Sequence, residues 1–279
     1  LRLFFGALVG GGTILIFLFT KPNEFQTSIN SSLQGTYFIQ GSIFAIMILV
    51  YLSSIALGTP VGEAAFLIQI HPIITLLLGY LFLKEKINTS KLLALFLAML
   101  GLVILTSPWQ WDSFLSSLIG DFLALSNGIL YAFYLLMGRW SLKYRAELSS
   151  SLSIAWVLLW GLLIGFPIII LLSLFPVQQE LTAFSLTILL SPSIILLGIL
   201  LTLFGSIIPY GLIMLSSSYD IESSKQSILL LGEPISAMIL GMLILSEGIT
   251  FWYIIGGGTL MIAIILILSS TRGREDWEN

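Results

Sequence analysis

Two ionisable side chains lie inside long apolar stretches of this sequence, and a proline follows each of them. They are His71 and Glu233, 162 residues apart. A histidine can change its charge near neutral pH, a carboxylate can bind a cationic group or carry a proton, and a proline frees a backbone carbonyl upstream. Both residues are therefore candidates for substrate binding or proton coupling. The alternative is a neutral imidazole bound to a backbone carbonyl and a neutral carboxylic acid that caps a neighbouring helix.

The segments around His71 and Glu233 are two copies of one repeat. Residues 65–87 align with residues 227–249 without a gap, so that Glu85 overlays Glu247. Lysines flank only the first of these two glutamates. An internal repeat in an apolar chain is typical of secondary transporters, which are often built from two related halves.

The composition indicates that the repeat lies in a membrane. Apolar residues make up 57% of the chain and charged residues only 9%, and the mean hydropathy is +1.06, values outside the range of soluble domains. A spanning helix needs about 20 apolar residues, which predicts an all-α polytopic membrane protein. The nine predicted transmembrane helices are 3–20, 36–57, 61–83, 89–106, 117–138, 151–174, 193–216, 224–245 and 250–269. Small residues at helix-packing spacing, such as Gly6 with Gly10 and the run Gly256–Gly258, fit close contacts between these helices.

The basic residues give the orientation of the spans. Alternation through the predicted helices puts every lysine and arginine except Arg2 on one face, which the positive-inside rule assigns to the cytoplasm. The C-terminal tail is therefore predicted to be cytoplasmic. The third and eighth predicted helices run in opposite directions, so the repeat is inverted. This predicts a ten-helix, five-plus-five design whose first helix is missing from the sequence.

Other polar and aromatic residues at membrane depth are costly unless they face a cavity or a partner. Asn127, Tyr131 and Tyr134 share one helix face and could line a path for substrate. Trp156 and Trp160, four residues apart, form an aromatic wall suited to an apolar or cationic ligand or else pack against neighbours. The remaining substrate-binding or coupling candidates are Gln69, Gln226 and Tyr210.

Glu63 and Lys225 occupy equivalent positions of the repeat, at opposite faces of the membrane. They are predicted either to be a pair of gates or to be interfacial residues that extend toward lipid headgroups.

These features together resemble the drug/metabolite transporter superfamily, and within it the EamA-type permeases. The resemblance covers nearly the whole chain and rests on the order and spacing of five features: Arg2 opening a span, the mid-helix proline, the run Leu83–Ile87, Gly120, and Glu233 with Pro234 before Leu245–Glu247. It implies two EamA-type repeats: residues 1–106 with helices 2–5 of ten, and residues 107–279 with helices 6–10 and a short cytoplasmic tail. It also implies a central cavity and export of amino acids, other metabolites or toxic compounds. His71 departs from the apolar or small residue that is usual before the proline.

The leading functional prediction is a secondary transporter in the plasma membrane that exports a small organic metabolite, such as an amino acid-like, amine or drug-like solute, by alternating access. An alternative substrate class is phosphorylated sugars or nucleotide sugars, which the lack of an arginine in the middle of a span disfavours. A channel or lipid scramblase is the alternative of another class. One histidine, no cysteine and isolated carboxylates do not form an enzyme site or a metal site, so no enzymatic activity, cofactor or bound metal is expected.

The predicted partners are the lipid bilayer and a small-molecule substrate, with proton coupling and a homodimer as further options. No nucleic acid is expected to bind, because the basic residues are scattered over membrane loops.

Overall fold

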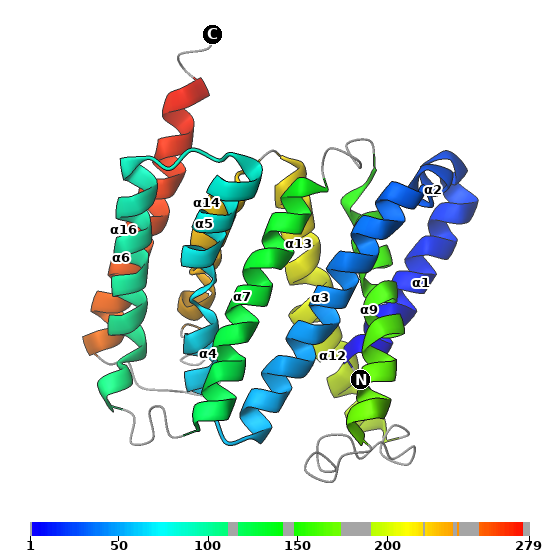
Figure 1. Cartoon of the computed structure of the whole chain (residues 1–279), viewed down its shortest axis with the longest axis horizontal. Coiled ribbons are helices and arrows are strands. Elements are labelled where there is room, and N and C mark those ends of the chain that lie inside the picture. The colour runs from blue at the N-terminus through cyan, green and yellow to red at the C-terminus, as the bar shows by residue number, and fades with distance from the viewer. Residues whose placement is uncertain are drawn as a thin grey trace. The chain divides into compact units, whose positions relative to one another are not determined.

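The computed structural model describes residues 2–110, 117–141, 148–173, 191–219, 221–236, 239 and 251–275. Helices fill almost all of these ranges, which contain no β-strand. The elements are α1 (Arg2–Thr20), α2 (Pro22–Ser28), α3 (Ser31–Ala56), α4 (Val61–Ile68), α5 (His71–Leu83), α6 (Thr89–Thr106), the 3₁₀ helix η1 (Pro108–Gln110), α7 (Leu118–Trp140), α9 (Ser150–Ser173), α12 (Pro192–Thr202), the π-helical turn η3 (Leu203–Ile207), α13 (Ile208–Ser218), α14 (Ser223–Leu230) and α16 (Phe251–Glu275) (Figure 1). The prediction of an all-α fold is confirmed.

Within the described ranges, eight segments are long and apolar enough to cross a membrane. They coincide with eight of the nine predicted spans, and the ninth, 224–245, extends beyond the described residues. Two of the spans are not continuous α-helices. The predicted span 61–83 consists of α4 and α5 with a turn between them, and the predicted span 193–216 contains the π-helical turn η3. The fold is therefore that of a polytopic membrane protein with interrupted helices.

The helices form two compact units, and each unit takes segments from both halves of the sequence. Unit 1 contains Leu1–Ala56 and Phe133–Ile221, and unit 2 contains Leu57–Ala132 and Glu222–Asn279. The sequence repeats and the compact units are therefore different divisions of the chain.

In unit 1, helix α9 packs against α1 and α3 (Figure 1). Glycines make these contacts close. A Cβ atom on Gly10 would lie 2.7 Å from the carbonyl oxygen of Ala155, and one on Gly41 would lie 2.6 Å from the Cβ of Trp160. Because lipid gives no hydrophobic drive to helix association, close backbone approach of this kind stabilises the unit through van der Waals contact.

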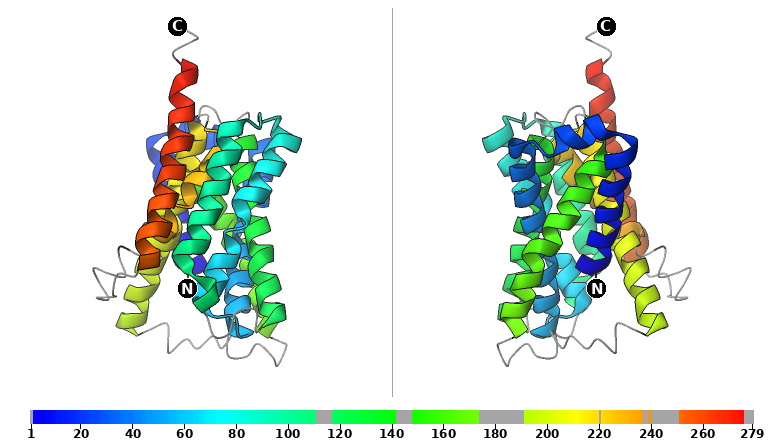
Figure 2. Two further views of the ribbon diagram at one scale, coloured as in Figure 1. Left: turned by 90° about the vertical axis from the view of Figure 1, so that its left-hand side faces the viewer. Right: turned by 90° about the vertical axis from the view of Figure 1, so that its right-hand side faces the viewer.

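In unit 2, helices α6 and α16 lie side by side (Figure 2). A Cβ atom on Gly256 would lie 2.3 Å from the backbone nitrogen of Leu105, and one on Gly101 would lie 2.8 Å from that of Leu260. A Cβ on Gly258, in contrast, would meet nothing within 4 Å. Of Gly256 and Gly258, Gly256 is thus the one that the packing needs. The core of this unit consists of Leu76, Ala94, Leu95, Ala98, Leu102, Leu105, Ile228, Leu231, Leu260, Ala263 and Ile267.

Candidate functional site

The span Val61–Leu83 is broken in its middle, at Gln69 and Ile70. The backbone N–H of Gln69 donates to the carbonyl of Phe66 at 3.0 Å, and that of Ile70 donates to Leu67 at 3.3 Å. These bonds reach back three residues instead of four, so the helix tightens and α4 ends. Pro72 contributes to the break because it has no N–H to donate to the preceding turn. Helix α5 then begins at His71.

The second copy of the repeat is broken at the equivalent place. Helix α14 begins 162 residues after α4 and has the same length of 8 residues. Its last turn contains the hydrogen bonds Leu231 N–H to Ile228 O at 3.1 Å and Gly232 N–H to Leu229 O at 3.0 Å. Both are the counterparts, 162 positions later, of the bonds at the first break. The chain is helical again from Glu233 to Ser236, and Glu233 is the counterpart of His71.

The repeat read from the sequence is therefore present in the backbone, down to the register of single hydrogen bonds. Helices α5 and α14 also lie side by side within unit 2 (Figure 1). Interrupted helices at corresponding positions of two related segments are a recurrent feature of transporter binding sites, because the ends of half-helices leave backbone groups available to a ligand.

His71 connects the first break to helix α14. Its Nδ1 lies 2.7 Å from the hydroxyl of Ser227, and only 1% of the residue is exposed. The Tyr131 ring on α7 packs against the imidazole, with 4.6 Å between ring centroids. Nε2 of His71 is buried and has no hydrogen-bond partner among the described residues. One imidazole nitrogen is thus fixed by the protein, and the other is left for a proton acceptor, a water or a ligand.

Helix α7 approaches the same break at Gly128. A Cβ atom on Gly128 would lie 2.5 Å from the carbonyl oxygen of Ile68, so only glycine allows this contact. Next to it, the Oδ1 atom of Asn127 is buried, as is Oε1 of Gln69 in the break itself, and neither has a hydrogen-bond partner among the described residues. Buried polar atoms without partners are costly. Their gathering around one helix break makes this the candidate binding site of unit 2.

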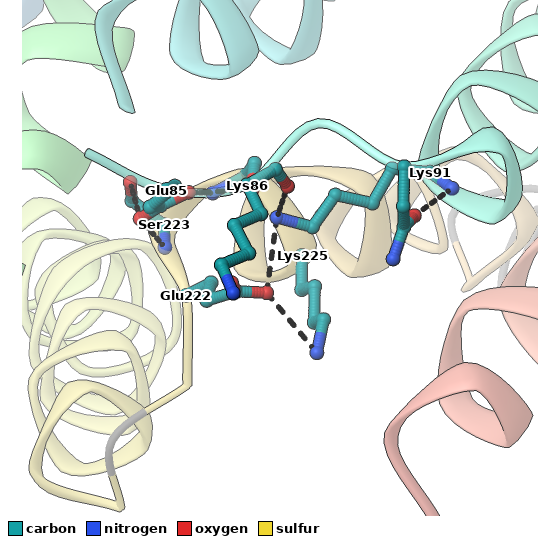
Figure 3. A network of polar contacts seen from close by, with 8 residues as sticks. Glu85, Lys86, Lys91, Glu222, Ser223 and Lys225 are labelled. Carbon is teal, nitrogen blue, oxygen red and sulfur yellow. Dashed lines mark hydrogen bonds and ion pairs between the residues drawn. The ribbon is translucent and has the colours of Figure 1, made fainter. Parts of the chain in front are cut away.

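A second polar cluster fixes the start of helix α14. The Glu85 carboxylate accepts hydrogen bonds from the backbone N–H groups of Ser223 and Ser224 at 2.7 and 3.1 Å and from their hydroxyls at 2.6 and 2.5 Å (Figure 3). This carboxylate satisfies the N–H groups that a helix start leaves unpaired, and it lies at the positive end of the helix dipole. Gly79 makes room for it, because a Cβ there would be 2.7 Å from Oε2. We refer to Glu85, Ser223 and Ser224 as the α14 clamp.

Three charged residues next to the α14 clamp form an ion-pair triad. Glu222 lies 3.0 Å from Nζ of Lys91 and 3.1 Å from Nζ of Lys225 (Figure 3). Lys91 is almost completely buried and also donates to the carbonyl of Lys86 at 2.7 Å. Burial alone would raise the pKa of Glu222, but the hydrogen bonds and charges of Lys91 and Lys225 outweigh this effect and hold the pKa below its ordinary value.

The two gate candidates are both buried. Lys225 belongs to the ion-pair triad, and Glu63 on α4 is only 1% exposed. Neither side chain reaches outward, as the interfacial alternative requires. Lys91, one of the basic residues used to predict the orientation of the spans, is also buried and lies within ion-pair distance of the Glu222 carboxylate.

The remaining predicted residues fall into two groups. In unit 2, Gln226 is buried beside Ser227, whereas Glu233 is exposed at the start of the segment after the second break. In unit 1, the indole N–H groups of Trp156 and Trp160 donate to Ser28 and Gln34 at 3.0 and 2.9 Å, so these rings hold the ends of α2 and α3. Tyr134 and Tyr210 contact each other edge to face at 5.1 Å.

Ser227 and Glu85 are among the residues of these clusters that sequence reasoning missed. Ser227 carries the hydrogen bond to His71, but a serine in an apolar helix usually bonds its own backbone. The only signal was that the other repeat copy has Ala65 at this position. From the sequence, Glu85 was recognised as a residue of the repeat, but no contact was predicted for its side chain. The neighbouring residues give no sign that it caps a helix that starts 138 residues later.

An all-helical chain with several spans and helices broken at repeat-related positions has the architecture of a multi-pass membrane transporter. The sequence pattern of the EamA-like transporter family matches residues 1–107 and 118–269, so the chain belongs to this family. An uncharacterized transporter of Archaeoglobus fulgidus is 26% identical over 219 residues, which cover 78% of this chain and 69% of that protein. A solved crystal structure superposes with a TM-score of 0.60 at 14% identity, covering 94% of this chain and 98% of the other. The predicted membership of the EamA-type permeases is confirmed.

Proposed function

We propose that this protein is a secondary transporter that exports a small organic solute across the plasma membrane by alternating access. The observation that carries the proposal is the pair of helix breaks with the same hydrogen-bond register, joined by the contact between His71 and Ser227. In this proposal the solute passes the first break and binds there to the buried polar atoms of Gln69, His71 and Asn127.

In this proposal the two helix breaks are the segments that change conformation during transport. A turn of two residues between short helices can change its φ and ψ angles while the hydrogen bonds within each half-helix stay intact. Gln69 is one of these turn residues and also carries one of the unpartnered oxygens. A solute that supplies the missing hydrogen bond would therefore favour one arrangement of the turn over another, which is the differential interaction that alternating access requires.

His71 and Glu233 are the proposed coupling groups. An imidazolium donates from both ring nitrogens, whereas the neutral tautomer that donates from Nδ1 to the Ser227 hydroxyl accepts at Nε2. Protonation of that tautomer therefore turns Nε2 from an acceptor into a donor. Gain or loss of a proton therefore changes which solute group the site can bind. Glu233 occupies the equivalent position after the second break and is the second group to test.

The experiment is an untargeted comparison of metabolites in the medium and cytosol of cells that overproduce the protein. We expect a solute that accumulates outside with the wild type and not with His71→Phe, which keeps the ring but loses both nitrogens, or with Ser227→Ala. Ser126→Ala is the matched control, because that hydroxyl bonds only to the carbonyl of Phe122 in its own helix. Equal export by His71→Phe, Ser227→Ala and Ser126→Ala at equal membrane abundance would refute the proposed site.

Two further arms test the rest of the proposal. Export by Glu233→Gln at the wild-type rate over the whole pH range would exclude this carboxylate as a coupling group. A tag at the C-terminus should be protected from a protease added outside intact cells, as a cytoplasmic tail in the plasma membrane requires.

A further inference from the structure

Arg2 brings a positive charge into the helical part of unit 1. Its Nε donates to the hydroxyl of Ser206 at 2.6 Å, and its Nη2 donates to the carbonyl oxygen of Gly205. Both partners lie in η3, the π-helical turn inside the span Pro192–Ser218. Arg2 itself opens α1, but its guanidinium contacts a turn in the middle of another span.

The sequence explains why the guanidinium is held there. Pro209 has no N–H, so it cannot donate to the carbonyl of Gly205, four residues earlier. Arg2 supplies a donor to this carbonyl. Gly205 packs directly against the guanidinium, since a Cβ there would be in van der Waals contact with Cζ of Arg2, at 3.7 Å. The π-helical turn thus orients one edge of the guanidinium.

The other end of the guanidinium is available to a ligand. A guanidinium has five N–H donors, and two hydrogen bonds to protein are present, which leaves about three donors, at Nη1 and Nη2. Among the described residues, no carboxylate lies within ion-pair distance of Arg2. Arg2 is one turn before Gly6, on the face of α1 that is buried in unit 1. An inward-facing cation without a counter-ion in a membrane protein is expected to have a function.

Aromatic rings adjoin the guanidinium. Cζ of Arg2 lies 6.0 Å from the centroid of the Phe44 ring. Phe44 contacts Tyr210 edge to face at 4.9 Å, and Tyr210 contacts Tyr134 in the same way at 5.1 Å. Two of the sequence-predicted lining residues, Tyr134 and Tyr210, therefore lie in the same cluster as Arg2. The cluster therefore places the positively charged guanidinium, with its unused N–H donors, beside an apolar and aromatic surface.

We infer that Arg2 forms a second substrate-binding site, in unit 1, where it binds the carboxylate of an organic monocarboxylate whose apolar part packs on Phe44 and Tyr210; this inference rests on the proposed transport function. The end of the guanidinium that carries Nη1 and Nη2 is a two-pronged donor that matches a carboxylate. One guanidinium also balances the single negative charge of a carboxylate. A phosphate monoester carries about −1.5 to −2 at pH 7 and would retain uncompensated charge beside the one cation of this cluster.

The test measures thermal stabilisation of the purified full chain by phenylpropionate and by phenylpropionamide, which has the same shape without the charge. We expect the carboxylate to raise the unfolding temperature and the amide to have little effect. Arg2→Gln should abolish the difference, and Arg2→Lys, which keeps the charge but not the fork, should retain only part of it. Lys21→Gln is the control for loss of one positive charge, since Lys21 lies exposed at the other end of α1.

The outcomes separate this inference from the proposed function. Equal stabilisation by phenylpropionate and phenylpropionamide, or by neither, would overturn the carboxylate site, as would an unchanged response in Arg2→Gln. If export still depends on His71 in that case, the proposed function stands and only the substrate class is wrong. If Arg2→Gln proves too unstable to purify, the comparison of Arg2→Lys with Lys21→Gln decides the question.

Discussion

Replacement of Glu85 by glutamine tests the α14 clamp directly. The carboxylate accepts four hydrogen bonds from Ser223 and Ser224, two at each oxygen. The amide of glutamine keeps one of these oxygens and turns an NH₂ group, itself a donor, toward the two donors that the other oxygen had bound. Two charge-assisted bonds are then lost, at about 1.5–3 kcal/mol each. A serine hydroxyl can rotate to accept from the amide and so recovers part of this. We therefore expect Glu85→Gln to reduce the free energy of unfolding by about 3 kcal/mol.

The assay combines a global and a local measurement. A loss of about 3 kcal/mol corresponds to roughly 6–10 °C in unfolding temperature for a chain of this size. Hydrogen exchange of a peptide that contains Ser223 and Ser224 should accelerate, because their amide protons lose a buried acceptor. Lys86→Gln is the control, since the Lys86 side chain is exposed and adjacent in sequence.

Two outcomes would contradict this role of the Glu85 carboxylate. If Glu85→Gln unfolds at the same temperature as Lys86→Gln and the Ser223 and Ser224 amides keep their protection, the carboxylate does not hold the start of α14. A fall in unfolding temperature without faster local exchange would show that the loss arises elsewhere in unit 2, and it would contradict the α14 clamp equally.

Two further predictions follow from unit 2. The pKa of Glu222 is lowered from 4.5 in the folded protein, so the stabilising contribution of its carboxylate is complete above about pH 4.5 and is lost as the pH falls further. The difference in unfolding temperature between the wild type and Glu222→Gln should therefore be largest near neutral pH and vanish in acid. A difference that grows on acidification would contradict the stabilising role of the ion-pair triad. Gly256→Ala should lower the free energy of unfolding by more than about 2 kcal/mol, because its Cβ would overlap the Leu105 backbone. Gly258→Ala, whose Cβ would meet no atom within 4 Å, should be neutral or should raise the free energy of unfolding by up to about 1 kcal/mol through helix propensity. Equal unfolding temperatures for the two variants would show that α6 and α16 are not packed so closely.

The fold was largely predictable because membrane spans depend on composition and length, which a sequence displays directly. The alignment of the two repeat copies was predictable with single-residue accuracy. His71 and Glu233, which are aligned in the sequence, each begin a helical segment, 162 positions apart. The break at Gln69 was not predicted. Neither Gln69 nor Ile70 is a helix breaker, and a proline can also be accommodated in a continuous kinked helix. The break becomes visible only in the hydrogen bonds that reach back three residues.

The site was only partly predictable, because polar side chains in a membrane protein choose partners that are distant in sequence. Spacing on a helix placed Asn127 and Tyr131 on one face, and in the structure the Tyr131 ring packs against His71. Spacing could not show that the Trp160 indole would donate a hydrogen bond to Gln34. Nor could it show that Arg2 would contact η3, since its partners Gly205 and Ser206 lie about 200 residues later in the sequence.

The α14 clamp also has a consequence for the order in which the chain is assembled. Glu85 and Ser223 are 138 residues apart, and the intervening segment Phe133–Ile221 belongs to unit 1. At the usual rate of about 5–20 residues per second, the ribosome reaches Ser223 roughly 7 to 28 seconds after it has made Glu85. During this interval the carboxylate lacks its partners, and α5 has been inserted without α14 beside it. Unit 1 can therefore be completed before the last helices of unit 2 have been synthesised. A chaperone or the insertion machinery would have to protect α5 during that time.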